Sequence, residues 1–190
     1  MNLAMPVLET SRLTIRPFSA ADLEATADIL HYPEAERRDL LDWTVAEYKI
    51  LARLHQPPLG DRAVELKANG ELVGAVGLVP ALNAFGMLPG FYATTGLPET
   101  TCNTPEYGLY WEIAPQHRRL GYATEAASGL IDYAFQSLRL ERIIAETDYD
   151  NLASQSVMRR LGMHILHNPY PEPPRLQVVG VLWNPACRAI

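Results

Sequence analysis

Residues 113–126 read IAPQHRRLGYATEA, and this junction decides how the chain around it folds. The preceding residues, EYGLYWEI (106–113), are rich in β-branched and aromatic side chains and predict a strand. The residues that follow (124–138) place apolar side chains from Ala126 to Leu138 at every fourth position, which predicts a half-buried helix. The sequence therefore predicts a strand, a short turn and a long helix in direct succession.

The turn itself has the composition of an anion site. Gly121 has no Cβ and Ala123 is small, so a ligand can approach the backbone, and the helix N-terminus offers free N–H groups. The alternative is an ordinary turn with solvated arginines. Neither a GxGxxG fingerprint nor a P-loop is present. The residues whose N–H groups we expect around a pyrophosphate are Arg118, Arg119, Leu120, Gly121, Tyr122, Ala123 and Thr124.

Composition and charge limit what the protein does. The chain has 190 residues, is 48% hydrophobic and carries a net charge of −6, which disfavours a nucleic acid as the main partner. No apolar run is long enough for a membrane span, and the start does not resemble a signal peptide. Cys102 and Cys187 have no metal-ligand spacing and are expected to be free thiols. We expect one cytoplasmic domain over residues 1–190, an enzyme or a binding module.

The remaining elements follow from periodicity, turn residues and caps. Asn69-Gly70 marks a hairpin within residues 62–79, and residues 80–104 fit no periodic pattern, so we expect a long loop that partly packs or lines a pocket. The other expected elements are strands at 13–16, 142–147, 163–168 and 176–183, and helices at 19–30, 45–54 and 151–162, the last capped by Asp150 or Asn151. This order predicts a mixed α/β (α+β) fold with about seven strands, about four helices and at least one parallel crossover.

Three segments resemble one family. The stretch IAPQHRRLGYATEA resembles motif A of the GNAT superfamily of N-acetyltransferases, with Arg118, Gly121 and Ala123 at its defining positions. The stretch NLASQSVMRRLGM (151–163) resembles the second half of the same fold. The opening LETSRLTIRP (8–17) is similar to the entry segment of the RimJ/RimL-like branch, which acetylates ribosomal-protein N-termini and other amines. The three matches stand in the family's order and span nearly the whole chain.

The resemblance implies a GNAT-type fold, a mostly antiparallel sheet whose two central strands part, and acetyl-CoA as co-substrate. The pyrophosphate would lie on the N–H groups from Arg118 to Thr124, and the pantetheine arm would contact the backbone of Ile113 and the side chain of Asn151. Asn151 has the alternative of a plain helix cap. The acceptor would be an amine, either a small molecule or a protein N-terminus, and no metal, nucleic acid or membrane is implied. The enzyme would act as a monomer or homodimer.

The catalytic residues are less well defined by the resemblance. Many relatives carry a glutamate where this chain has Gly108, and Glu106 lies two residues earlier on the same face of the strand. Glu112 shares that face and is the second candidate for the base, although both have the alternative of a solvated carboxylate at a strand edge. The tyrosine that often serves as general acid is Met158 here, which leaves Ser154 to protonate the thiolate or simply to begin the helix.

Two functions of different classes are compatible with the sequence. The first is an acetyl-CoA-dependent N-acetyltransferase that moves an acetyl group directly to a primary amine. The second is an acyl-CoA-binding regulatory module that keeps the cofactor site but has lost the chemistry, and Gly108 and Met158 are the reasons to consider it. An intact motif A does not distinguish the two, whereas thiol release with a panel of amines does.

Overall fold

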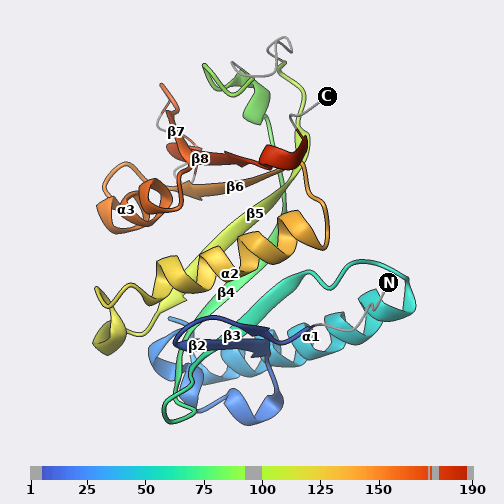
Figure 1. The fold of residues 1–190 in the computed structure, drawn as a ribbon, viewed down its shortest axis with the longest axis vertical. Coiled ribbons are helices and arrows are strands. Elements are labelled where there is room, and N and C mark those ends of the chain that lie inside the picture. The colour runs from blue at the N-terminus through green and yellow to red at the C-terminus, as the bar shows by residue number, and fades with distance from the viewer. Residues whose placement is uncertain (1–5, 93–99, 171, 173–175, 188–190) are drawn as a thin grey trace. The chain divides into compact units, whose positions relative to one another are not determined.

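The computed structural model describes residues 6–92, 100–170, 172 and 176–187 (Figure 1). The chain divides into two compact units, one made of Met1–Val79 with Tyr110–Leu138 and the other of Pro80–Leu109 with Arg139–Ile190. Two long strands, β4 (Leu72–Asn83) and β5 (Thr104–Ile113), contribute residues to both units. The expectation of one domain over residues 1–190 stays a prediction.

The first unit contains the N-terminal strands. β1 (Leu8–Glu9), β2 (Leu13–Pro17), β3 (Gly60–Leu66) and β4 pair in this order, each antiparallel to the next, and β5 follows β4. The predicted hairpin at Asn69-Gly70 joins β3 to β4, and Gly70 adopts a positive φ of 74° there. The short strand β1 was not expected from the sequence, because two residues are too few to show a period.

Helices α1 (Glu34–Arg53) and α2 (Tyr122–Gln136) cover opposite faces of these strands (Figure 1). Ala63 of β3 packs in a cluster with Leu41 of α1, whereas Ile15 of β2 points toward Gly129 of α2. Because successive side chains of a strand alternate between faces, Asp61 shares the face of Ala63 that α1 covers. The strong helical period predicted after the junction is confirmed by α2.

The helix predicted over residues 19–30 is wrong. Two 3₁₀ turns, Ala20–Asp22 and Ala25–Asp28, occupy this segment. The carboxylate of Asp22 accepts hydrogen bonds from the N–H and hydroxyl of Ser19 and pairs with Arg16, so side-chain bonds compete with the helical ladder.

The helix predicted at residues 45–54 is longer at its N-terminal end. It begins at Glu34, directly after Pro33, and ends at Arg53. Pro33 is the N-cap residue, and the negative charges of Glu34 and Glu36 in the first turn interact favourably with the positive end of the helix dipole.

The second unit holds the C-terminal strands. β6 (Arg142–Thr147) pairs with β8 (Val178–Trp183), and β8 pairs with β7 (His164–His167), all antiparallel. β5 pairs with β6 in parallel, with Gly108 opposite Ile144. The expected parting of these two strands involves residues of both units and stays a prediction.

Each face of β8 is covered by a different segment. On one face, Met158 of α3 (Leu152–Arg160) lies against Gly180. On the other face, Val179 and Val181 belong to an apolar cluster that includes Phe85 and Phe91 from the expected loop. The expectation that part of residues 80–104 packs is therefore confirmed. β4 continues to Asn83, a 3₁₀ turn spans Phe85–Met87, and residues 93–99 lie outside the described residues.

The mixed α/β fold is confirmed. The described residues contain eight strands, most of them antiparallel, and three α-helices, against about seven strands and four helices in the prediction. The differences are the short strand β1 and the replacement of the first expected helix by 3₁₀ turns. Cys102 and Cys187 are free and exposed, as expected. Within the described ranges, no helix is both long and apolar enough to span a bilayer.

Candidate active site

The turn before α2 has the backbone that an anion site needs. Arg119 and Gly121 both have positive φ angles, 64° and 85°, and Gly121 is the N-cap residue of α2. A Cβ at Gly121 would lie 3.4 Å from Nη2 of Arg12. Left-handed residues that alternate with ordinary ones turn successive N–H groups toward one side, which is how backbone nests hold anions.

The first turn of α2 has an unsatisfied polar group. Oγ1 of Thr124 is buried and, among the described residues, has no hydrogen-bond partner. The N–H groups of Tyr122, Ala123 and Thr124 occupy the first helical turn, where an α-helix leaves N–H groups without helical partners. An unpaired buried hydroxyl is costly unless a ligand or water completes it, so the residues present fit a bound phosphate group.

Arg118 is exposed, but its side chain is held at the end of β5. Its Nε donates to the carbonyl of Ile113 (2.9 Å), and its Nη2 pairs with Glu112 (3.2 Å). Its N–H donates to the carbonyl of Pro115 (3.3 Å). Arg118 therefore braces the end of β5, and the N–H groups that have no backbone partner among the described residues begin at Arg119.

The start of α2 is held by a segment far away in the sequence. The carboxylate of Glu125 accepts hydrogen bonds from the hydroxyls of Thr10 and Ser11 and from the N–H and Nε of Arg12. Burial raises the pKa of Glu125, but these hydrogen bonds outweigh it and bring the pKa to about 2. Arg12 also donates to the carbonyl of Leu120 (3.0 Å) and lies over the ring of Tyr122 (4.5 Å).

We call the group of Thr10, Ser11, Arg12 and Glu125 the entry clamp. The stretches LETSRLTIRP and YATEA are separate family signatures, and their contact was not expected from the sequence. The opposite charges of Arg12 and Glu125 were the one signal in the sequence that the two side chains can pair. They meet because β1 and β2 pair with each other beside α2. The clamp fixes the first turn of α2 without using its N–H groups.

The predicted catalytic carboxylates both stand in ion pairs. Glu106 is buried and bound by Arg142 through two hydrogen bonds, 2.5 and 2.7 Å long. The guanidinium of Arg142 lies over the rings of Phe91, Tyr92 and Trp183, at 5.4, 5.8 and 4.9 Å. Both oxygens of the Glu106 carboxylate therefore accept hydrogen bonds from one guanidinium, and the role of Glu106 as base stays a prediction.

Glu112 is more accessible than Glu106, with 36% of its side chain exposed. Besides Arg118, the imidazole of His31 lies 3.6 Å from its carboxylate. The three side chains belong to the first unit and form a polar group at the end of β5. The geometry gives Glu112 a bracing role with Arg118, and its role as base stays a prediction.

The residues predicted on α3 lie at its beginning. Asn151 is the N-cap, and its side-chain oxygen accepts the N–H of Ser154 (3.1 Å), which confirms the cap expected at Asp150 or Asn151. Asn151 is exposed and Ser154 is half-buried. Met158, at the position of the absent tyrosine, is fully buried against β8. A contact of Asn151 or Ser154 with acetyl-CoA stays a prediction.

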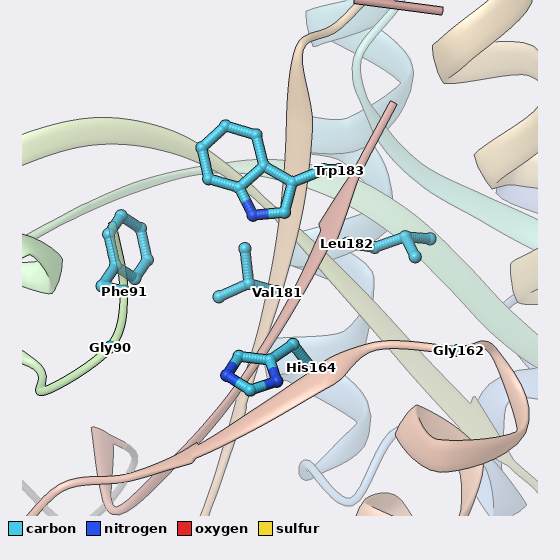
Figure 2. A pocket seen from close by; sticks show the side chains of 7 residues that line it. All are labelled: Gly90, Phe91, Gly162, His164, Val181, Leu182 and Trp183. Atoms are coloured by element: carbon cyan, nitrogen blue, oxygen red, sulfur yellow. The ribbon is translucent and has the colours of Figure 1, made fainter. Parts of the chain in front are cut away.

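A cavity of about 270 Å³ lies in the second unit (Figure 2). Phe91, Val181 and Trp183 form its apolar wall, and His164 contributes the polar edge. No residue of the predicted site lines this cavity, so it carries none of the expected chemistry.

Known proteins share both the sequence and the fold. The family model described as an acetyltransferase (GNAT) domain matches residues 12–164. YoaA of Bacillus subtilis (strain 168), an uncharacterized N-acetyltransferase, is 29% identical over 164 residues, which cover 83% of this chain and 82% of YoaA. The FsC-acetyl coenzyme A-N(2)-transacetylase of Aspergillus fumigatus is 26% identical over 185 residues, 90% of this chain and 72% of that protein. An acetyltransferase from Agrobacterium tumefaciens str. C58 superposes with a TM-score of 0.64 and 26% identity over 96% of both chains.

The matched region contains the turn before α2 and the whole of α3, in the order that the sequence signatures predicted. Two N-acetyltransferase relatives align with most of the chain, and the fold agrees with a solved acetyltransferase. The chain therefore belongs to the RimJ/RimL-like acetyltransferases of the GNAT family and is an N-acetyltransferase.

Proposed function

We propose that this chain binds acetyl-CoA at the turn before α2 and transfers its acetyl group to a primary amine. GNAT acetyltransferases use acetyl-CoA as co-substrate, which supplies the activated acetyl thioester. The observation that carries the proposal is the buried hydroxyl of Thr124, which lacks a partner in the described residues and lies in the first turn of α2. A pyrophosphate oxygen at this point would satisfy the hydroxyl and meet the positive end of the helix dipole.

Each part of the site has a proposed task. The N–H groups from Arg119 to Thr124 hold the pyrophosphate, and Gly121 lets it approach the backbone. Ile113 and Asn151 contact the pantetheine arm. Ser154 donates a proton or a hydrogen bond to the leaving thiolate. These assignments rest on the family's pattern and on the positions of the residues within their own units.

The acceptor is a primary amine, either a protein N-terminus, an amino acid or a small amine. An amine attacks a thioester only as the neutral base, so a proton must leave the ammonium before the N–C bond forms. Glu106 and Glu112, the two candidates for taking that proton, both stand in ion pairs with arginines. The reaction needs no metal ion and no covalent enzyme intermediate.

The test combines binding with turnover. Acetyl-CoA binding is measured by calorimetry, and thiol release is followed with Ser- and Ala-initiated peptides, free amino acids and polyamines. We expect binding and turnover of at least one amine class. Binding without thiol release from any amine would favour the regulatory module, and the absence of binding would overturn the proposed site.

A further inference from the structure

Three neighbouring strands of the first unit bring a carboxyl and a phenol together. Asp61 of β3 stands opposite Gly77 of β4, and Tyr110 comes from β5. The phenol of Tyr110 lies beside the carboxylate of Asp61 and interacts with it. A Cβ built at Gly77 would lie 2.5 Å from Cε1 of Tyr110 and 2.9 Å from Oδ1 of Asp61. The two side chains therefore meet above β4 in space that only a glycine leaves open.

Asp61 differs from the other two candidate carboxylates because it forms no ion pair among the described residues. Arg62, its neighbour in sequence, points to the opposite face, where its guanidinium lies 4.9 Å from the ring of Tyr133. Tyr48 of α1 donates its hydroxyl to the backbone carbonyl of Asp61, which fixes the strand without using the carboxylate. Asp61 and Tyr110 are both partly accessible to solvent.

The surroundings adjust the proton affinity of this carboxyl. Burial raises the pKa of Asp61 to about 6, the hydrogen bond from Tyr110 lowers it, and the charge of Glu47 raises it. A base whose pKa lies near the working pH is well suited to take a proton from an ammonium. The ionisable groups that face the pair are Glu47 and Tyr48 of α1 and Glu112 of β5.

The pair also lies on the strand that leads into the proposed acetyl-CoA site. Tyr110 precedes Ile113 by three residues, which is about 10 Å along a strand. Because side chains alternate along a strand, Tyr110 and Gly108 lie on the same face of β5. Many relatives carry a glutamate at the position of Gly108. Asp61 lies on this same side of the sheet, two strands away from β5 and across Gly77 of β4.

We propose that Asp61 is the general base of the acetyl transfer and that Tyr110 is a positioning residue that holds its carboxylate. This inference rests on the proposed function. Asp61 takes one proton from the acceptor ammonium, and the freed electron pair on nitrogen forms the N–C bond. The C–S bond breaks and its electron pair leaves with sulfur. The second nitrogen proton goes to that thiolate, and Asp61 returns its own proton to solvent.

The test uses the amine of the panel that gives the fastest thiol release, and kcat/KM is measured as a function of pH. Asp61→Asn should lower kcat by about 10²–10⁴-fold, while acetyl-CoA affinity from calorimetry stays within about twofold. Asp39→Asn, an exposed carboxylate of α1, is the matched control and should keep the wild-type rate.

Substitutions of two neighbouring residues should shift the acidic limb of the pH profile of kcat/KM in opposite directions. Tyr110→Phe removes a bond that favours the ionised carboxylate, so the pKa of Asp61 rises and the limb moves to higher pH. Glu47→Gln removes a like charge, so the pKa falls and the limb moves to lower pH. A merely structural role of either residue would lower the rate without such opposite shifts.

The outcomes separate the inference from the proposed function. Full activity of Asp61→Asn across pH, or a limb that moves the same way in both neighbours, would overturn the role of Asp61 and leave the acetyltransferase standing. If Asp61→Asn does not fold, the shifts of the acidic limb in Tyr110→Phe and Glu47→Gln decide whether Asp61 is the base. If the wild-type chain releases no thiol with any amine, the proposed function fails and the role of Asp61 fails with it.

Discussion

The N-termini of α2 and α3 are built in different ways. α3 closes its own N-terminus, because the side chain of Asn151 accepts the N–H of Ser154. α2 begins at a left-handed glycine that has no side chain to cap it, and its first turn contains the hydroxyl of Thr124, which has no partner in the described part of the chain. The entry clamp holds α2 from outside, through Glu125, without covering the N–H groups.

The difference teaches how a ligand-binding helix end can be recognised. A helix that satisfies its own first turn gains about 1 kcal/mol from the cap and presents few free donors. A helix that leaves its first turn open forgoes this stability and must be anchored elsewhere. Substitutions at four positions test the contrast, and they are ordered from the largest expected effect to the smallest.

Gly121→Glu should weaken acetyl-CoA binding by about 100-fold or more, because a side chain and a negative charge enter the phosphate site. Calorimetry on the folded variant measures the affinity. Gly70→Glu is the matched control, since Gly70 also has a positive φ (74°) and a Cβ at that position would have no atom within 4 Å. Equal losses in both variants would assign the effect to backbone strain instead of to the site.

Glu125→Gln should lower the free energy of unfolding by about 1–2 kcal/mol at pH 7, after allowance for partial exposure to solvent. The folded pKa of about 2 lies below the ordinary value of 4.5, so the ionised clamp stabilises the protein above that value. This stability is lost as the pH falls from about 4.5 toward 2. The difference between wild type and variant should therefore shrink along this range.

Urea unfolding at pH 7, 5 and 3 measures the effect of the clamp, with the exposed Asp132→Asn of the same helix as control. A difference that stays constant between pH 7 and pH 3 would show that Glu125 is not held as an ionised acceptor.

Thr124→Val should weaken acetyl-CoA binding by about tenfold, or about 1.4 kcal/mol, because a charge-assisted hydrogen bond to phosphate is lost. Stability should stay equal or rise, since an unpaired buried hydroxyl is removed. Thr104→Val is a matched control, because Oγ1 of Thr104 is also buried without a partner in the described residues. An affinity of Thr124→Val equal to that of the wild type would remove the hydroxyl from the site.

Asn151→Ala should lower the free energy of unfolding by about 1 kcal/mol, since the cap of α3 is lost. Asn151→Asp keeps a capping oxygen but loses the amide donors, so its stability should match the wild type. Its acetyl-CoA affinity then reports the proposed ligand contact alone. Equal affinity in wild type and Asn151→Asp would leave Asn151 as a cap only.

The segments that the sequence predicted well are those with a long period or a strong local signal. Residues 142–147 form β6 as predicted, because a short apolar run between turn residues has few alternatives. The row of apolar residues in α2 and the Asn69-Gly70 hairpin were also predicted correctly. Residues 19–30 were not, because the bonds of Asp22 with Ser19 and Arg16 compete with a helix that the local pattern favours.

The environment of the carboxylates could not be predicted from spacing. The spacing of Glu106 on its strand gave no sign of an ion pair, but Arg142 of β6 binds its carboxylate. Asp61 gave no signal, because nothing near it in sequence shows that Tyr110, from a strand much later in the chain, would lie beside it. In both cases, side chains from strands that are distant in the sequence determine the electrostatic environment of the carboxylate, and the local sequence does not.

The sequence alone determined the family, the motif before α2 and the positions of its glycine and first helical turn, because these depend on local backbone preference and helical periodicity. Tertiary structure alone decided which polar groups have partners. The clamp on Glu125, the pair of Glu106 with Arg142, the open hydroxyl of Thr124 and the contact of Asp61 with Tyr110 all join or isolate groups that lie far apart in the chain. Such contacts arise only when strands and helices pack, and they decide which partners surround each carboxylate.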